Sequence, residues 1–191
     1  MRAFFGMAPF FFAIFAPAIT MRLLAEERRS GTIQLLATMP VRDVEVVTGK
    51  FFAALGLVAV ALGLTLPYAL TVSRLGNPDW GPILGGYLGL LLMCGAYVGI
   101  GLLASALTES QIVAFIVGFL VCFFFFMLEK VIGYVSQELV QVFQYISFDH
   151  HFQNIARGVI DSRNIIYYLS VIVFSLVAAS QVLQRRKWAT A

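Results

Sequence analysis

Five long runs without a charged residue divide this chain of 191 residues. Each is long enough to cross the hydrocarbon core of a bilayer, which takes about 20 residues in a helix. The runs lie at about 3–21, 51–73, 82–108, 110–128 and 164–184. Lipid offers a backbone no hydrogen-bond partners, so each run must satisfy its own peptide groups. The sequence therefore predicts an all-α, polytopic membrane protein with five transmembrane helices.

The composition excludes the main alternative classes. Hydrophobic residues make up 60% of the chain and charged residues 12%, whereas a soluble domain carries about 25% charged residues. The net charge of +3 is small and the basic residues are scattered, so no nucleic-acid partner is expected. The two cysteines, Cys94 and Cys122, each lie within an apolar run, and no disulfide is predicted.

Prolines and small residues within the runs indicate how the spans bend and pack. Pro17 and Pro67 lie inside predicted spans and are expected to kink them. The third span carries small residues four apart, a spacing that lets helix backbones approach closely in lipid: Gly85, Gly89, Gly95 and Gly99. Packing within one subunit is favoured over a dimer seam, because such patterns are common in membrane helices.

The distribution of basic residues predicts the orientation of the spans. If the loop from Arg22 to Lys50 is cytoplasmic, eight Lys and Arg residues lie inside and five outside. Cytoplasmic loops carry the excess of such residues. The sequence therefore predicts an N-terminus outside, a cytoplasmic C-terminus, and the plasma membrane (in bacteria, the inner membrane) as location.

The predicted cytoplasmic segment 22–50 has the pattern of an elbow. It holds nine of the chain's 23 charged residues, and residues 26–29 are expected to continue the first helix beyond the membrane. Gly31 permits a tight turn, a short helix follows to about Thr38, and Pro40 ends it. Asp43 is expected to cap the helix that returns into the second span.

The short helix within the elbow, here called the crossbar, has one apolar face. Its apolar residues follow an i, i+3 spacing: Ile33, Leu36 and Met39, with Leu35 beside them. This face either rests in the lipid headgroups or is presented to a cytoplasmic partner. Periodicity alone does not separate these two interpretations.

The segment "AEERRSGTIQLLATMPVRDVEVVTGKFFAAL" (25–55) resembles the hallmark of ABC-2 type permease subunits. Three more stretches are similar to the gliding-motility-associated ABC permease branch of that family: "NPDWGPILGGYLG" (77–89), "LTESQIVAFIVGF" (107–119) and "HFQNIARGVIDSRNIIYYLS" (151–170). The tail "LQRRKW" (183–188) fits as well, so the resemblance covers essentially the whole chain as a single transmembrane permease domain, 1–191.

The resemblance implies a subunit that couples ATP hydrolysis by a separate ABC ATPase to export of a substrate. It also implies a second permease subunit, either an identical copy or a paralogue. Family members usually have six spans, so a first span is expected that this sequence does not contain. The elbow would be the coupling helix that docks on the ATPase, with these residues involved: Glu26, Glu27, Arg28, Arg29, Gly31, Thr32, Ile33, Leu35, Leu36, Met39 and Pro40.

A second polar segment, 129–163, is predicted to be extracytoplasmic. Residues 137–146 mix Gln and Glu with apolar residues, which suggests an amphipathic helix. The resemblance implies a helical hairpin that dips back between the last two spans, with His151, Arg157 and Asp161 among its residues. A plain interfacial helix is the alternative.

No catalytic, cofactor or metal site is predicted. Gly49-Lys50 lacks the Walker A pattern, because Phe51 stands where Ser or Thr is required. Asp149-His150-His151 offers too few suitably spaced ligands for a zinc site. Glu109 is expected to mark a tight turn, with Thr108 or Ser110 as a helix cap. Two alternative functions remain open: a membrane scaffold that contacts an ATPase without transport, and, with less support, an intramembrane metalloenzyme.

Overall fold

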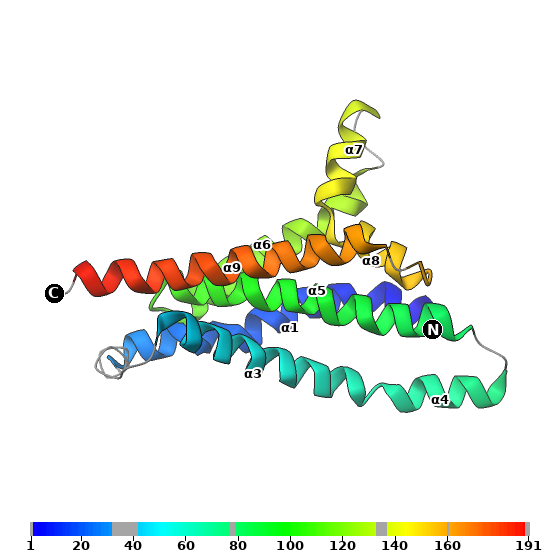
Figure 1. The fold of residues 1–191 in the computed structure, drawn as a ribbon, viewed down its shortest axis with the longest axis horizontal. Coiled ribbons are helices and arrows are strands. Elements are labelled where there is room, and N and C mark those ends of the chain that lie inside the picture. Colours follow the sequence, from blue (N-terminus) through cyan, green and yellow to red (C-terminus); the bar gives the residue numbers. More distant parts are fainter. Residues whose placement is uncertain (1, 32–41, 77–78, 133–136, 160, 190–191) are drawn as a thin grey trace.

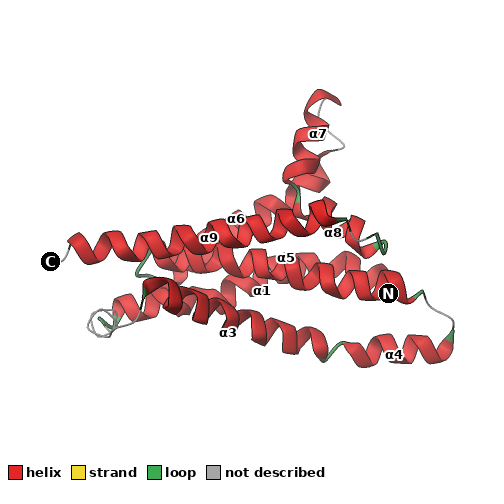
Figure 2. Cartoon of the chain, viewed as in Figure 1, coloured by secondary structure: helices red, strands yellow, loops and turns green. Residues whose placement is uncertain are grey.

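The structure is a computed structural model that describes residues 2–31, 42–76, 79–132, 137–159 and 161–189. Every element in these ranges is a helix (Figures 1 and 2). In chain order the helices are α1 (Arg2–Arg29), α3 (Asp43–Gly63), α4 (Leu66–Leu75), α5 (Trp80–Leu107), α6 (Gln111–Val131), α7 (Gln137–Ile146), α8 (Phe148–Ala156) and α9 (Ser162–Ala189).

Five helical segments of the described chain are long and apolar enough to cross a membrane, as the sequence predicts. They are Phe4–Arg29, Asp43–Leu75, Trp80–Leu107, Gln111–Val131 and Ser162–Gln184. Each covers the corresponding uncharged run to within one residue, and the first two extend past it by two turns or more on the side of the elbow. The prediction of an all-α, polytopic membrane protein is confirmed.

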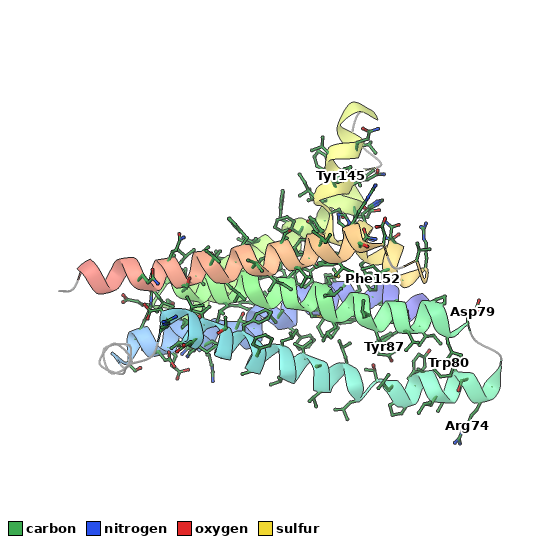
Figure 3. All side chains as sticks on the ribbon, viewed as in Figure 1. Arg74, Asp79, Trp80, Tyr87, Tyr145 and Phe152 are labelled. Atoms are coloured by element: carbon green, nitrogen blue, oxygen red, sulfur yellow. The ribbon has the colours of Figure 1, made fainter. Side chains whose placement is uncertain are left out.

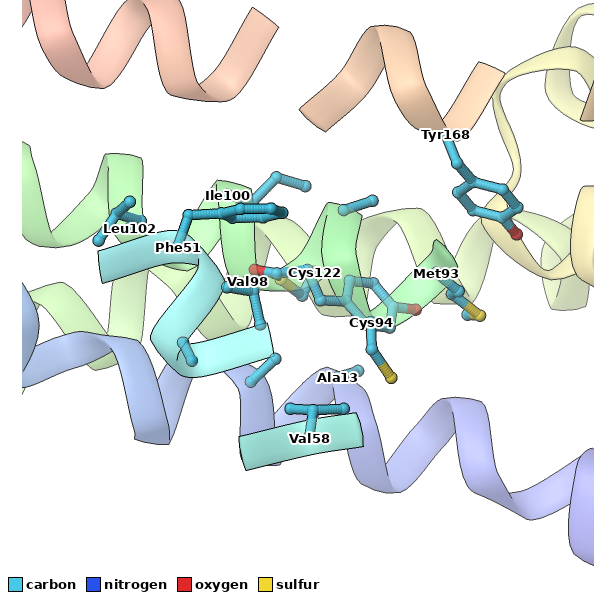
Figure 4. Packing of buried hydrophobic residues seen from close by; sticks show 14 of the residues in the cluster. Ala13, Phe51, Val58, Met93, Cys94, Val98, Ile100, Leu102, Cys122 and Tyr168 are labelled. Atoms are coloured by element: carbon cyan, nitrogen blue, oxygen red, sulfur yellow. Dashed lines mark hydrogen bonds between the residues drawn. The ribbon is translucent and has the colours of Figure 1, made fainter. Parts of the chain in front are cut away.

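Helix α5 forms the centre of the bundle. In its most apolar stretch 78% of the residues are buried inside the molecule, against 22–39% in the other four spans. It packs against α1, α3, α6, α8 and α9. Figure 4 shows Met93, Cys94 and Val98 of α5 beside Ala13 of α1 and Val58 of α3, all of them buried. The outer helices therefore expose their apolar faces to lipid while α5 is shielded from it.

The second span is interrupted at Leu64–Thr65, between α3 and α4. Pro67 lies in the first turn of α4, where its missing N–H is no loss. It cannot donate to Gly63, so the helical ladder stops there, and Thr65 instead donates from its backbone N to Leu62 O (3.0 Å). The kink expected at Pro67 is thus a complete break between two helices.

The bundle has two structurally different ends, which Figure 1 shows at left and right. The end with Gly31, the start of α3 and the α5–α6 turn is here called the elbow end. The other end, with the start of α5 and with α8, is called the α8 end. At the elbow end Thr108 Oγ1 accepts a hydrogen bond from Ser110 N (2.9 Å), so "LTESQ" forms the expected tight turn.

Helices α7 and α8 pack differently against the bundle, although only Ser147 separates them in the sequence. Helix α8 packs against α5, α6 and α9 and buries one face, including Phe148, Phe152 and Ile155. Helix α7 contacts α6 and α8 and projects away from the bundle (Figure 1). Its Tyr145 is 70% exposed. The amphipathic helix expected at 137–146 is present, and the part of the segment that enters the bundle is α8.

Candidate functional site

The last turn of α1 carries the charged residues with which the elbow begins. Helix α1 extends to Arg29, so residues 26–29 continue the helix as predicted. Ser30 ends it: its backbone N and its hydroxyl both donate to Glu26 O at 2.9 Å. Gly31 follows with φ +72°, a conformation that residues with a Cβ rarely adopt, so the turn requires glycine here. The chain therefore changes direction at the position that the sequence indicates.

The chain returns into the bundle through α3. Glu45 Oε2 accepts a hydrogen bond from Arg42 N (3.2 Å), so Glu45 satisfies the entry to the helix. Asp43, expected to be the cap, instead lies in the first helical turn, where its negative charge interacts favourably with the positive end of the helix dipole. The prediction of Asp43 as the cap was wrong by one position: the cap is Arg42, whose backbone N–H is bonded by the Glu45 side chain.

An ion pair joins the two arms of the elbow. The ammonium group of Lys50 in α3 pairs with the carboxylate of Glu27 in α1, and their side chains are only 19% and 30% exposed. Lys50 also donates to the backbone carbonyl of Leu23. A largely buried pair is screened by water less than a surface pair. Through Lys50, the outgoing and returning helices are held together at the base of the elbow.

Ser105 joins the base of the elbow to the central helix. Its hydroxyl, on α5, accepts hydrogen bonds from the backbone N of Leu24 (3.1 Å) and of Ala25 (3.0 Å). The same hydroxyl donates to Met21 O (3.0 Å). Ser105 is fully buried. A side chain inserted into a helical ladder in this way fixes the position of that turn. The last part of α1 is thus bonded to α5 directly below the elbow.

One turn further into the bundle, α1 and α5 pack closely at a glycine. A Cβ added to Gly101 of α5 would collide with Thr20 Oγ1 of α1. Thr20 is fully buried and donates its hydroxyl to Ala16 O (2.9 Å). On the neighbouring helix α6, a Cβ on Gly118 would lie 3.3 Å from Pro17 Cβ. These glycines let α1 pack directly against α5 and α6.

The crossbar lies outside the described residues. This concerns six of the residues assigned to ATPase coupling: Thr32, Ile33, Leu35, Leu36, Met39 and Pro40. The remaining five, Glu26 to Arg29 and Gly31, lie at the end of α1 and in the turn after it. Of these, Glu27 pairs with Lys50, and Ser105 bonds the turn of α1 just before them, so the site is the attachment of the elbow to the bundle.

The four glycines predicted to mediate helix packing all contact helices of the same chain. Gly85 lies against the carbonyl of Ile155, and a Cβ on Gly89 would lie 3.1 Å from Phe152, so both face α8. A Cβ on Gly95 would lie 3.0 Å from Ile172, and one on Gly99 3.2 Å from Ser175, so both face α9. Their lack of side chains lets α8 and α9 pack onto α5.

Helix α9 secures the corner between α7 and α8 with two tyrosines. The hydroxyl of Tyr167 donates to Ile146 O, and that of Tyr168 donates to Phe148 O (2.6 Å). Ser147 Oγ accepts from His150 N (3.3 Å) and caps α8. The carbonyls at the end of one helix and the start of the next are thereby satisfied by side chains from a third.

His151 connects three helices at the same corner. Its Nε2 donates to Tyr145 O of α7 (3.1 Å), and its Nδ1 lies 2.7 Å from Asn164 Oδ1 of α9. The ring stacks on Tyr167 with centroids 4.1 Å apart. The two other residues assigned to this segment lie at its edge. Arg157 follows the last turn of α8 and Asp161 Oδ1 accepts from Arg163 N (3.0 Å) at the start of α9.

Asp149, His150 and His151 each contact a different partner. Asp149 pairs with Lys130 at 2.9 Å, and His150 Nδ1 lies 3.8 Å from Glu129 Oε2. His151 contacts Asn164 instead, so the three side chains have three separate partners. No group of three or more His, Cys, Asp or Glu suitable for a metal ion is found in the described part of the chain.

Sequence reasoning missed two residues that organise these ends. Ser105 fits the small-residue spacing of its helix, and nothing in that pattern distinguishes a hydrogen-bonding serine from a packing residue. Lys130 follows Glu129 at the end of an apolar run, and its partner Asp149 lies 19 residues further on. Two adjacent charges at the end of a span, Glu129 and Lys130, are the signal that could have indicated such a pair.

These features define a class of protein: a polytopic membrane protein with one shielded central helix and a charged elbow anchored to it. Residues 4–188 match the family described as ABC-2 family transporter protein. Because the match spans nearly the whole chain, the protein belongs to the ABC-2 transporter family, as its sequence motifs predict. It is a membrane component of an ABC transporter, which implies association with an ABC ATPase. A comparison with curated proteins finds no match.

Proposed function

We propose that this chain is the permease subunit of an ATP-driven exporter and receives the movement of a separate ATPase through its elbow. The ATP chemistry is assigned to that other chain, since Gly49-Lys50 lacks the Walker A pattern. A second permease subunit would complete the transporter. The similar stretches at 77–89, 107–119 and 151–170 favour the gliding-motility-associated branch.

The proposed orientation places the elbow end in the cytoplasm. Eight of the 13 Lys and Arg residues belong to the elbow and the C-terminal tail, and the positive-inside rule assigns such loops to the cytoplasm. Labelling tests this. With Arg29→Cys and Asp161→Cys variants, an impermeant maleimide added to intact cells should modify only the cysteine at 161. Modification of the cysteine at 29 would show the opposite orientation, in which no cytoplasmic ATPase could contact the elbow.

The observation that carries the coupling proposal is the double attachment of the elbow. The Lys50–Glu27 pair joins α1 to α3, and the Ser105 hydroxyl joins the same turn of α1 to α5. Helix α5 in turn contacts every other span. A force on the crossbar would therefore reach the central helix through bonded contacts. Coupling between sites requires such an element with more than one arrangement.

A charge on the crossbar tests the docking step. Leu36→Asp should abolish co-purification with the co-expressed cognate ABC ATPase, because an apolar docking face does not accept an unpaired carboxylate. Val159→Asp is the matched control, since Val159 is 65% exposed at the α8 end. Both variants should still insert into the membrane. Unchanged ATPase binding by Leu36→Asp would mean that the crossbar rests on lipid.

Vesicle assays separate export from scaffolding. In vesicles that contain both subunits and ATP, an exporter moves cargo in proportion to ATP hydrolysed. Stimulated ATPase activity without movement of any tested amphipathic or polymeric cargo would contradict export and favour a scaffold.

A further inference from the structure

We infer that the α8 end contains a binding site for the phosphate group of a membrane lipid, a property independent of ATPase coupling. A cavity of about 840 Å³ opens there between α1, α4, α5, α6 and α8. Its volume lies in the range of ordinary ligand sites. Five elements converge on it, so it belongs to the folded bundle and not to one loop.

The cavity lies at the depth of the lipid headgroups. Its walls come from the first residues of α1 and α5 and the last residues of α6, which are the ends of predicted spans. Trp80 at the start of α5 is 48% exposed and Tyr68 of α4 is 49% exposed. Tryptophan and tyrosine concentrate at membrane interfaces. Figure 3 shows Trp80 beside Asp79 at this end, with Tyr87 nearby along α5.

The lining of the cavity has two chemically different parts. One part is apolar and comes from four elements: Phe5, Val72, Pro82, Ile83 and Phe152. The other part is polar and charged: Asp79, Lys130, Asp149, Gln153 and Arg157. An occupant that satisfies both parts must itself be amphipathic, with an apolar body and a polar or charged group.

The charged part holds two cations, Lys130 and Arg157, and two carboxylates, Asp79 and Asp149. Asp149 is nearly buried, with 6% of its side chain exposed, and its Oδ2 accepts from both Lys130 (2.9 Å) and Gln153 (3.2 Å). Its negative charge is therefore already compensated. Lys130 is 49% exposed and an ammonium group has three donors, so it retains donors for a ligand.

Arg157 supplies the second cation. It lines the cavity just after the last turn of α8, and none of its side-chain nitrogens pairs with an acid within the described residues. A guanidinium group binds phosphate oxygens through two parallel N–H bonds. Lys130 from the end of α6 and Arg157 from the end of α8 both line the cavity together with apolar side chains, so a lipid phosphate with its acyl chains suits the lining. Charge-assisted hydrogen bonds from lysine and arginine to phosphate are about twice as strong as neutral ones, so the two cations would hold the headgroup.

Fluorescence of the purified full chain tests this inference. Trp188→Phe leaves Trp80 as the single tryptophan, next to the cavity-lining Asp79. The protein is titrated with dihexanoyl phosphatidylglycerol, with glycerol 3-phosphate, which lacks the chains, and with dihexanoylglycerol, which lacks the phosphate. We expect saturable binding of the phospholipid and at least tenfold weaker binding of the other two.

Two further substitutions locate the site. Arg157→Gln should weaken phospholipid binding by about tenfold, the loss expected for a charge-assisted hydrogen bond. Arg74→Gln is the matched control, because Arg74 is exposed at the same end and does not line the cavity. Val72→Phe should weaken binding by filling the cavity without changing any charge. Equal binding of dihexanoylglycerol, binding of glycerol 3-phosphate alone, or no effect of Arg157→Gln would each overturn the lipid-phosphate site.

Discussion

Removing the Ser105 hydroxyl provides the sharpest test of the attachment between the elbow and the central helix. Ser105→Ala eliminates three interhelical hydrogen bonds, two from the backbone N–H groups of Leu24 and Ala25 and one to Met21 O. Interhelical side-chain hydrogen bonds in membrane proteins contribute about 0.6 kcal/mol each on average. The loss of all three should therefore lower the free energy of unfolding by about 2 kcal/mol.

The assay is unfolding of the purified protein in mixed micelles with increasing SDS, followed by circular dichroism. Ser180→Ala is the matched control: Ser180 is also buried, but its hydroxyl donates only to Val177 O within its own helix. It should cost about 0.5 kcal/mol or less, since helical carbonyls already have partners. A Ser105→Ala protein as stable as the control would refute the claim that these bonds hold α1 to α5.

The same variant tests the mechanical role through a separate measurement. If force passes from the elbow to α5 through Ser105, the variant should bind the ATPase normally but export less cargo per ATP hydrolysed. Reduced stability with an unchanged ratio of export to hydrolysis would make Ser105 a structural residue only. That outcome would leave the lipid site at the α8 end untouched.

Two further substitutions address the packing and the α8 corner. Gly101→Leu should destabilise the bundle by about 1–3 kcal/mol, the usual cost of overpacking, because its Cβ would collide with Thr20. Gly56→Leu is the control: a Cβ there meets open space, so this variant should be neutral in the same SDS titration. Asn164→Leu removes the amide oxygen that lies 2.7 Å from His151 Nδ1. The rate of amide hydrogen exchange within α8 should rise about fivefold, which corresponds to the loss of one hydrogen bond of about 1 kcal/mol. Unchanged exchange would mean that the two tyrosines hold the corner alone.

The sequence predicted the spans well because hydrocarbon imposes a simple rule on them. Any helix that crosses a bilayer must be long and nearly uncharged, so residues 3–21 and 164–184 are recognisable without any knowledge of their neighbours. The turn at Gly31 and the break near Pro67 were also visible, since glycine and proline act on their own backbone. These features are local, and local features can be inferred from a single chain.

Contacts between distant segments were not visible in the same way. Ser105 and Leu24 are 81 residues apart, and Lys130 and Asp149 lie on different helices. In each pair the residue types permit many partners, and only the packing of the bundle selects one. The cavity at the α8 end has the same origin, because it is enclosed by residues between Phe5 and Arg157 that no sequence spacing relates.

The break at Leu64–Thr65 has a consequence for the membranes in which this protein can work. The segment Asp43–Leu75 has 33 residues, about 50 Å if it were one straight helix, whereas a hydrocarbon core is about 30 Å thick. At the break Tyr87 donates its hydroxyl to Thr65 O (3.1 Å) and accepts from Thr65 Oγ1 (3.0 Å), which satisfies the interrupted backbone. We expect such a joint to let α4 take a different tilt from α3, so that a 33-residue span can fit a bilayer thinner than its full helical length.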